Sequence, residues 1–539
     1  MGNFVCCFTT TKEAKDFPID SNFGLSSPLP SWPPGEGFAN GTFDLGGLQV
    51  RQITSFNKIW STFESGLDDV GVSFFDPSLT PNGFSMLGSY CQSNDYQLFG
   101  WVLAGKDDSG STLASPVDYT LVLNFSNSCY IWLPTPPPGY NPVGYAVTSS
   151  SQKPSLDKIR CVRADLTDEC EVDELLWGAD NGVNVYSSRP KNRGTQSPGV
   201  GVGTFIIEDE NNNNSFIYCL KNNNFDKLSS SMPNLAQVEA LIQEYSPRLY
   251  FHPSETYLPS STTWYFSNGV LLYHTGDESN PIPVEPTGSN LPQGGSNDET
   301  YWLDLPTNET QRERIKKGNL QSSEAYIHIK PMLGATFTDI QVWVFYPFNG
   351  PVTAKIGLID VPLGKIGEHI GDWEHLTLRI SNFNGVLYRV YFSEHSGGTW
   401  VDTPFLEFQE GSNKIVGYSS LHGHATYSTP GLVLQGTDLV GLINDTAKSD
   451  MFLDVGAKYV ILDEYITSVS EPPWLNYTRK WGPKITYAIG IELEKLKNSS
   501  IGIVESAIEK LLEVLPTEIY EEDGPTGPKM KDNWDGDER

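Results

Sequence analysis

The sequence predicts a mainly β protein in which a pseudo-threefold β-prism is followed by a β-sandwich with peripheral helices. The chain of 539 residues is too long for one ordinary core, so more than one domain is expected. Aromatic residues make up 12% of it, and its 50 glycines and 37 prolines are typical of short strands joined by turns. A repeat in the first half and strand-like apolar runs in the second half complete the prediction.

The predicted prism, residues 45–228, contains three copies of a β unit. Each copy has a strand end followed by proline, at Asp76-Pro77, Leu133-Pro134 and Arg189-Pro190, with spacings of 57 and 56 residues. Each then re-enters the fold at a glycine-containing turn, and the closing glycines are Gly88, Gly144 and Gly203. Matching turn chemistry at a fixed period indicates three packed copies, with these glycines in equivalent positions.

A short helix is expected within the third copy, at residues 170–177. Glu171, Asp173 and Glu174 are acidic residues of the kind that favour the first turn of a helix.

The predicted sandwich, residues 232–520, opens with an amphipathic helix. Asn234 is suited to cap it, and apolar residues repeat at helical spacing at Leu235, Val238, Leu241 and Ile242. Strand-like runs follow at residues 340–346, 374–380, 386–393 and 458–462. Charged helical patterns occupy residues 309–317 and 501–514. Residues 521–539 are rich in Gly, Pro and Asp and are expected to be a mobile tail, in which Trp534 is the one residue suited to dock.

The segment Gly367-Glu-His-Ile-Gly-Asp-Trp-Glu-His375 predicts a cation site. In an extended strand, side chains two residues apart share a face, so Asp372 and Glu374 project together, away from Trp373 and His375. His369 lies just before the strand and can fold over the same end. Two carboxylates and one imidazole favour a divalent cation such as Ca, Mg or Mn over Zn. The alternative is that Trp373 is core and the acids form a solvated rim.

The distribution of histidines supports a polar site in this domain. None of the eight precedes His252, and five lie between His369 and His424. Beside the predicted cation ligands, His395, His422 and His424 stand among small or acidic residues, in loops that leave room for a ligand. These three residues are candidates for an additional polar site.

The charge of the chain excludes some partners. A formal net charge of −30 argues against nucleic acid, which needs clustered Lys and Arg, and against charge-driven adhesion to anionic membranes. No apolar run approaches the 18 residues of a membrane span, and no secretory signal pattern is present.

The N-terminal segment, residues 1–44, carries a lipidation pattern. Met1-Gly-Asn-Phe-Val-Cys-Cys7 offers Gly2 for myristoylation and Cys6 and Cys7 for palmitoylation, although Cys6 stands where the usual motif has Ser or Thr. Two acyl chains make a stable anchor, whereas one does not. The alternative is a disordered start with two incidental thiols. Lipidation predicts a protein at the cytoplasmic face of the plasma membrane or of endomembranes, with its other cysteines reduced.

Several motifs together resemble the plant vacuolar protein sorting-associated protein 62 family. They are Leu249-Tyr-Phe-His-Pro-Ser-Glu255, Gly371-Asp-Trp-Glu-His375, Leu421-His-Gly-His-Ala-Thr-Tyr427, Trp474-Leu-Asn-Tyr477 and Trp481-Gly-Pro483. The resemblance covers nearly the whole chain, and the family name implies a role in vacuolar protein trafficking. The N-terminal repeat is similar to the β-prism of multivesicular-body-associated proteins, which implies engagement of membranes or lipid head groups.

Part of the second domain resembles the necrosis- and ethylene-inducing peptide-like proteins. That family carries Gly-His-Arg-His-Asp-Trp-Glu, to which His369, Asp372 and Glu374 correspond in order and spacing, and a later stretch similar to Ser393-Glu-His-Ser-Gly-Gly-Thr-Trp400. The resemblance implies a divalent cation that helps to engage glycosylated sphingolipid head groups. Gly371 departs from the motif, which has a second histidine there.

Two classes of function follow from these patterns. The first is a lipid-anchored, non-enzymatic protein that binds a divalent cation and lipid or glycan head groups at a membrane. The second is a metal-assisted hydrolase with His395 or His422 as general base. The absence of a nucleophile elbow, a phosphate loop or an HExxH pattern favours the first. A soluble carbohydrate-binding prism is a third class, suggested by the glycines in the loops of each repeat.

Overall fold

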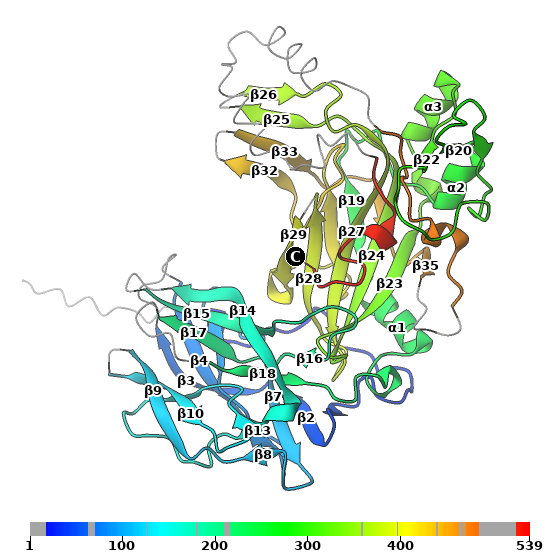
Figure 1. Ribbon diagram of the computed structural model, residues 1–539. Helices are drawn as coiled ribbons and strands as arrows, with labels where there is room; N and C mark the ends of the chain where they lie inside the picture. Colours follow the sequence, from blue (N-terminus) through cyan, green and yellow to red (C-terminus); the bar gives the residue numbers. More distant parts are fainter. Residues whose placement is uncertain are drawn as a thin grey trace, which may run out of the picture. The chain divides into compact units, whose positions relative to one another are not determined.

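The computed structural model describes residues 18–62, 70–125, 127–178, 182–209, 216–356, 359–395, 397–437, 440–462, 466, 469–484 and 524–538 (Figure 1). These residues are mainly in antiparallel sheets with few helices, which confirms the predicted fold class. Within the described ranges, no helix is long and apolar enough to span a bilayer.

The chain forms two compact units. The first unit contains residues 1–24, 47–191 and 201–220, and the second contains residues 25–46, 192–200 and 221–539. Each unit is therefore discontinuous in sequence.

Three antiparallel sheets dominate the first unit. Their strands are β3 (Phe56–Thr62), β4 (Val72–Pro77) and β6 (Tyr90–Ser93); β9 (Asp118–Phe125), β10 (Cys129–Thr135) and β12 (Ala146–Thr148); and β14 (Thr167–Gly178), β15 (Val183–Pro190), β17 (Phe205–Asp209) and β18 (Tyr218–Lys221). Shorter pairings join β2 (Leu48–Ile53) and β5 (Ser85–Met86) to β7 (Val102–Asp107), and β8 (Leu113–Ala114) and β11 (Tyr140–Asn141) to β13 (Cys161–Arg163). Each of the three sheets contains one of the predicted repeats.

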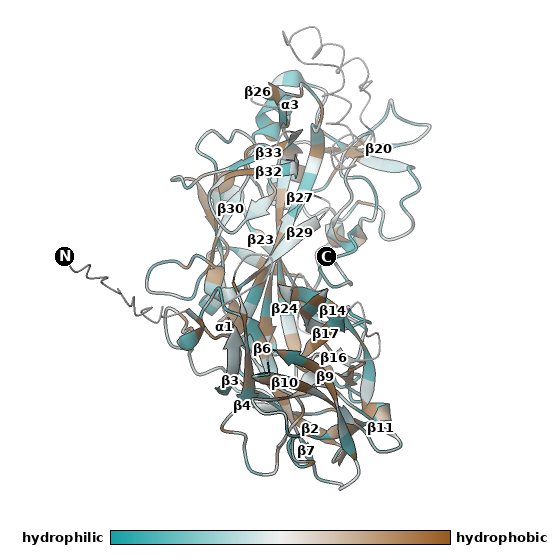
Figure 2. Cartoon of the chain, turned by 90° about the vertical axis from the view of Figure 1, so that its left-hand side faces the viewer, coloured by the Kyte–Doolittle hydropathy of each residue, from teal (hydrophilic) through white to brown (hydrophobic). Residues whose placement is uncertain are grey.

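The three sheets share one core. Phe74 of β4, Ile131 of β10 and Val185 of β15 are fully buried in the same cluster of apolar side chains. Figure 2 shows the hydrophobic stretches along β10 and β17. One inward-facing apolar side chain from each repeat is what a pseudo-threefold arrangement requires.

The repeats meet where two of the predicted glycines lie. A β-carbon added to Gly88 would stand 2.8 Å from the Cα of Gly144 and 2.7 Å from the Cγ2 of Thr204. The third repeat therefore contributes Thr204, one residue after the predicted Gly203. Gly203 instead has a φ of +77°, and a β-carbon there would stand 2.1 Å from the carbonyl oxygen of Trp101, so both its backbone conformation and this close approach require glycine.

Replacing Gly88 by Ala is expected to destabilise the first unit by about 1–3 kcal/mol, because a methyl group there overlaps the backbone of Gly144. The measurement is denaturant unfolding. Gly24→Ala is the control, since a β-carbon at Gly24 meets nothing within 4 Å. Equal midpoints for the two variants would show that the repeats do not meet as closely as described.

The helix predicted at residues 170–177 is wrong, because this segment lies within strand β14. Glu171 and Asp173 are two residues apart and share a strand face, where both carboxylates bind Arg189 of β15 at 3.0 and 2.7 Å. The cross-strand ion pairs outweigh the weak helical preference of an acidic run.

A six-stranded sheet forms the centre of the second unit. Its order is β29 (Gly397–Asp402), β28 (Leu387–Glu394), β27 (His369–Ser381), β24 (Phe337–Asn349), β23 (Ala325–Met332) and β35 (Tyr459–Ile461). The strand-like runs predicted at 340–346, 374–380, 386–393 and 458–462 coincide with β24, β27, β28 and β35.

Smaller sheets surround this one. They contain β19 (Arg248–Phe251), β30 (Val416–Ser419), β31 (Thr426–Tyr427) and β34 (Phe452–Asp454); β25 (Thr353–Ile356), β26 (Ile359–Pro362), β32 (Gly431–Thr437) and β33 (Val440–Thr446); and β20 (Leu271–His274), β21 (Ile282–Pro283) and β22 (Tyr301–Asp304).

The predicted helices at 234–242 and 309–317 are confirmed as α1 (Leu235–Tyr245) and α3 (Glu309–Lys316). Asn234 caps α1 as predicted, and Gln237 completes a capping box with it. A further helix, α2, spans Thr262–Ser267. The helix predicted at 501–514 lies outside the described residues.

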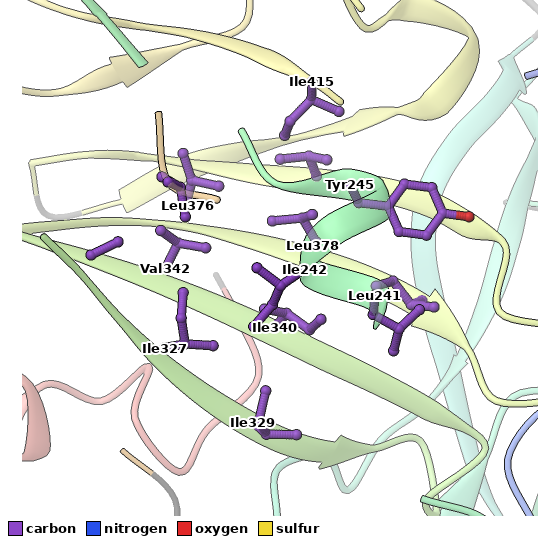
Figure 3. Close-up of a cluster of buried hydrophobic side chains, with 14 of the residues drawn as sticks. Leu241, Ile242, Tyr245, Ile327, Ile329, Ile340, Val342, Leu376, Leu378 and Ile415 are labelled. Carbon is purple, nitrogen blue, oxygen red and sulfur yellow. The ribbon is translucent and has the colours of Figure 1, made fainter. Parts of the chain in front are cut away.

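The two faces of the six-stranded sheet have different environments. One face packs its aliphatic residues against α1 and β19, as Figure 3 shows for Leu241, Ile242, Leu376 and Leu378. The other face carries an aromatic cluster that includes Trp343, Trp373 and Trp481.

Residues 524–538 pack on the aromatic face of the sheet. Trp534 is 6% exposed and Glu538 is 3% exposed. The backbone joins the unit through hydrogen bonds from Trp481 to Pro525 and from Thr195 to Asp535. The predicted mobility of the tail is therefore wrong for these residues. The prediction rested on the polar composition of the tail, which does not reveal that the sheet provides buried cationic partners for Asp537 and Glu538.

Candidate functional site

Strand β27 positions the predicted cation ligands. Its antiparallel register with β24 places Asp372 opposite Tyr346 and Glu374 opposite Val344. Both acids lie on the aliphatic face of the sheet and are 8% exposed. Trp373 and His375 lie on the opposite face, as the strand alternation predicts.

Asp372 is paired with an imidazole from a distant loop. Its Oδ2 lies 2.9 Å from Nδ1 of His424, and the other ring nitrogen of His424 lies 3.0 Å from the carbonyl oxygen of Tyr257. When Asp372 is ionised, both partners are hydrogen-bond acceptors, and both ring nitrogens of His424 must carry hydrogen to satisfy them. The ring also stacks on Tyr346 at 3.8 Å between centroids.

The two acids differ in their proton affinity. Burial and the negative charge of Asp372 raise the pKa of Glu374 well above its usual value, and Ser393 donates to the Glu374 carboxyl at 2.5 Å. Burial opposes ionisation of Asp372 too, but the hydrogen bond from His424 lowers its pKa. The ionised form is therefore favoured for Asp372 and the neutral form for Glu374.

His369 lies at the start of β27, beside Asp372. Its Nδ1 is 2.8 Å from the carbonyl oxygen of Gly371, and burial lowers its pKa, which favours the neutral ring that binds metals. Gly371 has a φ of +68°, and a β-carbon there would stand 2.8 Å from the carbonyl of Trp481. No side chain fits at this position, so the chain has Gly371 where the Gly-His-Arg-His-Asp-Trp-Glu motif has its second histidine.

The histidines of the candidate additional site share an unusual backbone. His395, His422 and His424 have φ values of +55°, +66° and +60°. Such conformations cost on the order of 1–3 kcal/mol each in non-glycine residues and persist only where the surroundings hold them. Functional sites commonly contain strained residues of this kind.

A buried carboxylate holds the loop of residues 420–425 in place. Oε2 of Glu255 accepts from the backbone N–H of His422 at 2.6 Å, while Oε1 accepts from Thr256 and Tyr257 at 2.8 Å. Nε2 of His395 is 3.2 Å from Asn444, and a β-carbon on Gly423 would be 3.4 Å from the His395 ring. The structure thus brings His395, His422 and His424 to one end of the sheet.

Several residues at this end of the sheet have roles that local sequence patterns do not indicate. Glu255 orders the loop, Ser393 binds Glu374, and Tyr346 stacks on His424. Glu255 lies within a motif noted in the sequence, but its role depends on a contact with His422, which is 167 positions away.

The donor set suits a hard cation after a rearrangement. Among the described residues, no three His, Cys, Asp or Glu side chains are arranged as a ligand set. Asp372 is instead hydrogen-bonded to His424, and the raised pKa of Glu374 favours its protonated form. A divalent cation would have to displace the contact with His424 and the proton of Glu374, after which Asp372, Glu374 and His369 offer two oxygen ligands and one nitrogen ligand.

The fold and the site define a class of protein: a β-rich chain with a prism-like unit and a sandwich unit that buries a carboxylate–imidazole cluster. The family model of vacuolar protein sorting-associated protein 62 matches residues 19–538. The chain belongs to this family, as its motifs predict.

Comparisons with other known proteins give distant matches. No match was found among the curated proteins. Among solved structures, GNIP1Aa from Chromobacterium piscinae is 20% identical over 37% of this chain and 40% of that chain, with a TM-score of 0.28. NLPPya in complex with glucosamine is 14% identical over 35% of this chain and 67% of that chain, with a TM-score of 0.21. The non-toxic HaNLP3 protein is 11% identical over 43% of this chain and 77% of that chain, with a TM-score of 0.19. This chain therefore spans less than half of GNIP1Aa.

Proposed function

We propose that this protein is a membrane-associated, non-enzymatic member of its family that binds a divalent cation and, with it, lipid or glycan head groups during endomembrane trafficking. The observation that carries the proposal is the buried pair of Asp372 and Glu374 on one face of β27, beside His369. Two acids held close together repel each other when both ionise, and a divalent cation relieves that repulsion.

The surroundings of the pair support binding rather than hydrolysis. Asn444 faces His395 and Tyr257 packs against the ring of His422 at 5.4 Å, so both proposed general bases are engaged in structural contacts. The family name associates the chain with vacuolar protein sorting. A cation at Asp372, Glu374 and His369 would add positive charge at one end of an acidic unit, where an anionic or hydroxyl-rich head group can ligate it.

Metal binding is expected to raise the unfolding temperature of the protein. Ligand linkage gives about 2.7 kcal/mol at free metal one hundred times the dissociation constant. The measurement is thermal unfolding with Ca, Mg or Mn, together with the protons released on binding, because Glu374 must be deprotonated to act as a ligand. The variant Asp372→Asn, Glu374→Gln should lose the response.

Glu171→Gln with Asp173→Asn is the matched control, since these acids also share a strand face but bind Arg189. If millimolar metal does not change the unfolding temperature of the parent protein, Asp372 and Glu374 have a structural role and do not bind the cation.

Membrane association is proposed to depend on Gly2, Cys6 and Cys7, which lie outside the described residues. Gly2→Ala should move the protein to the soluble fraction of cells, because the myristoyl chain is one of the signals that a stable anchor needs. Replacing Cys6 and Cys7 alone should leave weak, reversible binding. Identical fractionation of the Gly2 variant and the parent would contradict the anchor.

A further inference from the structure

Residues 524–538 occupy a groove on the aromatic face of the sheet, opposite the candidate cation site. The end of this segment places the Glu538 carboxylate among four polar side chains of β23, β24 and β27. Their distances to Glu538 are 3.3 Å for Lys330, 2.9 Å for Gln341, 3.1 Å for His375 and 2.6 Å for Thr377. The side chains of Lys330 and Glu538 are both fully buried. The sheet thus forms a complete pocket for one carboxylate.

A second pocket holds the preceding acid. Asp537 binds the guanidinium groups of Arg379 and Arg193, the latter at 2.8 Å. The groove therefore presents Lys330, Arg379 and Arg193 in a chain whose net charge is −30. This local positive charge matches two consecutive carboxylates.

An aromatic shelf receives Trp534. Its ring stacks on His328 at 3.7 Å and 4°, and its carbonyl oxygen lies 3.1 Å from Nε2 of His328. Lys330 and Gln341 bind the carbonyl oxygen of Asn533 at 2.7 and 3.1 Å. A cavity of about 300 Å³ remains beside Trp534, between His328, Glu471 and Lys529. The ring therefore rests on the shelf without filling its surroundings.

These contacts have the organisation of a peptide complex. One aromatic anchor and two carboxylates occupy separate pockets, and side chains of the sheet fix the backbone between them. Most of the contacts that involve Asp537 and Glu538 are polar or ionic, and another segment of the same chemistry can make them.

We propose that this groove is a recognition site for peptides that carry Trp followed by acidic residues three and four positions later, and that residues 524–538 are its resident, displaceable ligand. A partner protein with such a segment competes with the tail for Lys330, Arg379 and His328. The tail acts at high effective concentration because it is tethered to the sheet by the chain. A partner peptide therefore binds only when its affinity and concentration outcompete the tail.

The test uses the full-length chain and a labelled peptide of residues 524–538, with fluorescence anisotropy as the measurement. A chain variant with Trp534→Ala, Asp537→Asn and Glu538→Gln weakens its own tail, and it should bind the peptide at least tenfold more tightly than the parent does. A peptide with the same three substitutions should bind this variant at least tenfold more weakly than the original peptide.

A groove substitution completes the design. Adding Lys330→Gln to the triple variant should abolish its tighter binding of the peptide, because it removes the ammonium group that binds Glu538 of the peptide. If the triple variant does not fold, Glu538→Gln alone should give a gain of about threefold to tenfold. Equal binding by parent and variant chains, or by original and substituted peptides, would overturn the proposal. The substituted residues are all outside the candidate cation site, so a failure of peptide binding and a failure of metal binding are read from different variants.

Discussion

Replacing Arg379 by Met is expected to lower the free energy of unfolding by about 3–5 kcal/mol, because it leaves a buried carboxylate without its partner. Arg379 binds both oxygens of Asp339, at 2.9 and 2.8 Å, and the Asp339 side chain is fully buried. The guanidinium also binds Asp537 and lies 4.4 Å from the ring centre of Trp400. Met keeps most of the volume and none of the charge. Urea unfolding measures the loss.

Two comparisons distinguish this effect from a general loss of packing. Arg389→Met removes a guanidinium that also lies over Trp400, at 5.4 Å, but its partner Asp402 is partly exposed, so a loss of less than about 1 kcal/mol is expected. The double variant Arg379→Met, Asp339→Leu should recover much of the stability, since neither charge then remains buried. Equal losses for Arg379→Met and Arg389→Met would show that the buried charge is not the cause.

Acidification is expected to release residues 524–538 from the sheet. Burial and the neighbouring Lys330 lower the pKa of His328 to about 3. The stacked ring of Trp534 contributes to this burial, which disfavours the charged form of the imidazole. Undocking exposes the ring and returns its pKa to about 6.5. The undocked state thus binds the proton more readily, so docking is fully favourable above about pH 6.5 and weakens by about 1.4 kcal/mol per unit below it.

The acids of the tail extend the effect to lower pH. Burial opposes ionisation of Glu538, but Lys330 and His375 bring its pKa well below the usual range, and Arg379 lowers the pKa of Asp537. Docking that depends on these carboxylates is retained above their ordinary pKa values, about 4, and is lost as the pH falls further. Together the three groups should weaken docking by about 2 kcal/mol between pH 7 and pH 5, mostly through His328.

Hydrogen exchange of residues 524–538 between pH 8 and pH 4, corrected for the intrinsic rate, measures the release. In a His328→Gln variant, the dependence between pH 6.5 and pH 5 should disappear while that below pH 4.5 remains. Protection that does not change with pH in the parent would contradict the coupling.

Local patterns predicted the elements of this fold well. The alternation of β27 predicts which face Asp372 and Glu374 occupy, and Asn234 marks the start of α1, because both signals depend on neighbours in sequence. The triple repeat likewise predicts three sheets. The acidic run at 170–177 misleads because Arg189, which binds Glu171 and Asp173, lies on the next strand.

The environment of the site was less predictable because it depends on contacts between distant segments. The pairing of His424 with Asp372 spans 52 positions, and that of Glu538 with His375 spans 163. The sequence of residues 521–539 contains no indication that Lys330 and Arg379 lie together on one face of the sheet, where they bind the acids of this segment. Composition alone therefore predicts mobility for a segment that is in fact docked.

The division of the chain has a consequence for how the protein is synthesised. Residues 25–46 belong to the second unit, where Phe38 enters the core and Trp32 donates a hydrogen bond to Asn384, 352 positions later. These residues leave the ribosome long before the residues that they pack against are synthesised, so their apolar side chains stay exposed to solvent during that time. Closing so long a loop costs entropy and predicts slow, high-contact-order folding of the second unit. Expressed fragments cut once between the two units would lack part of one core, and such fragments expose the apolar surface that chaperones bind.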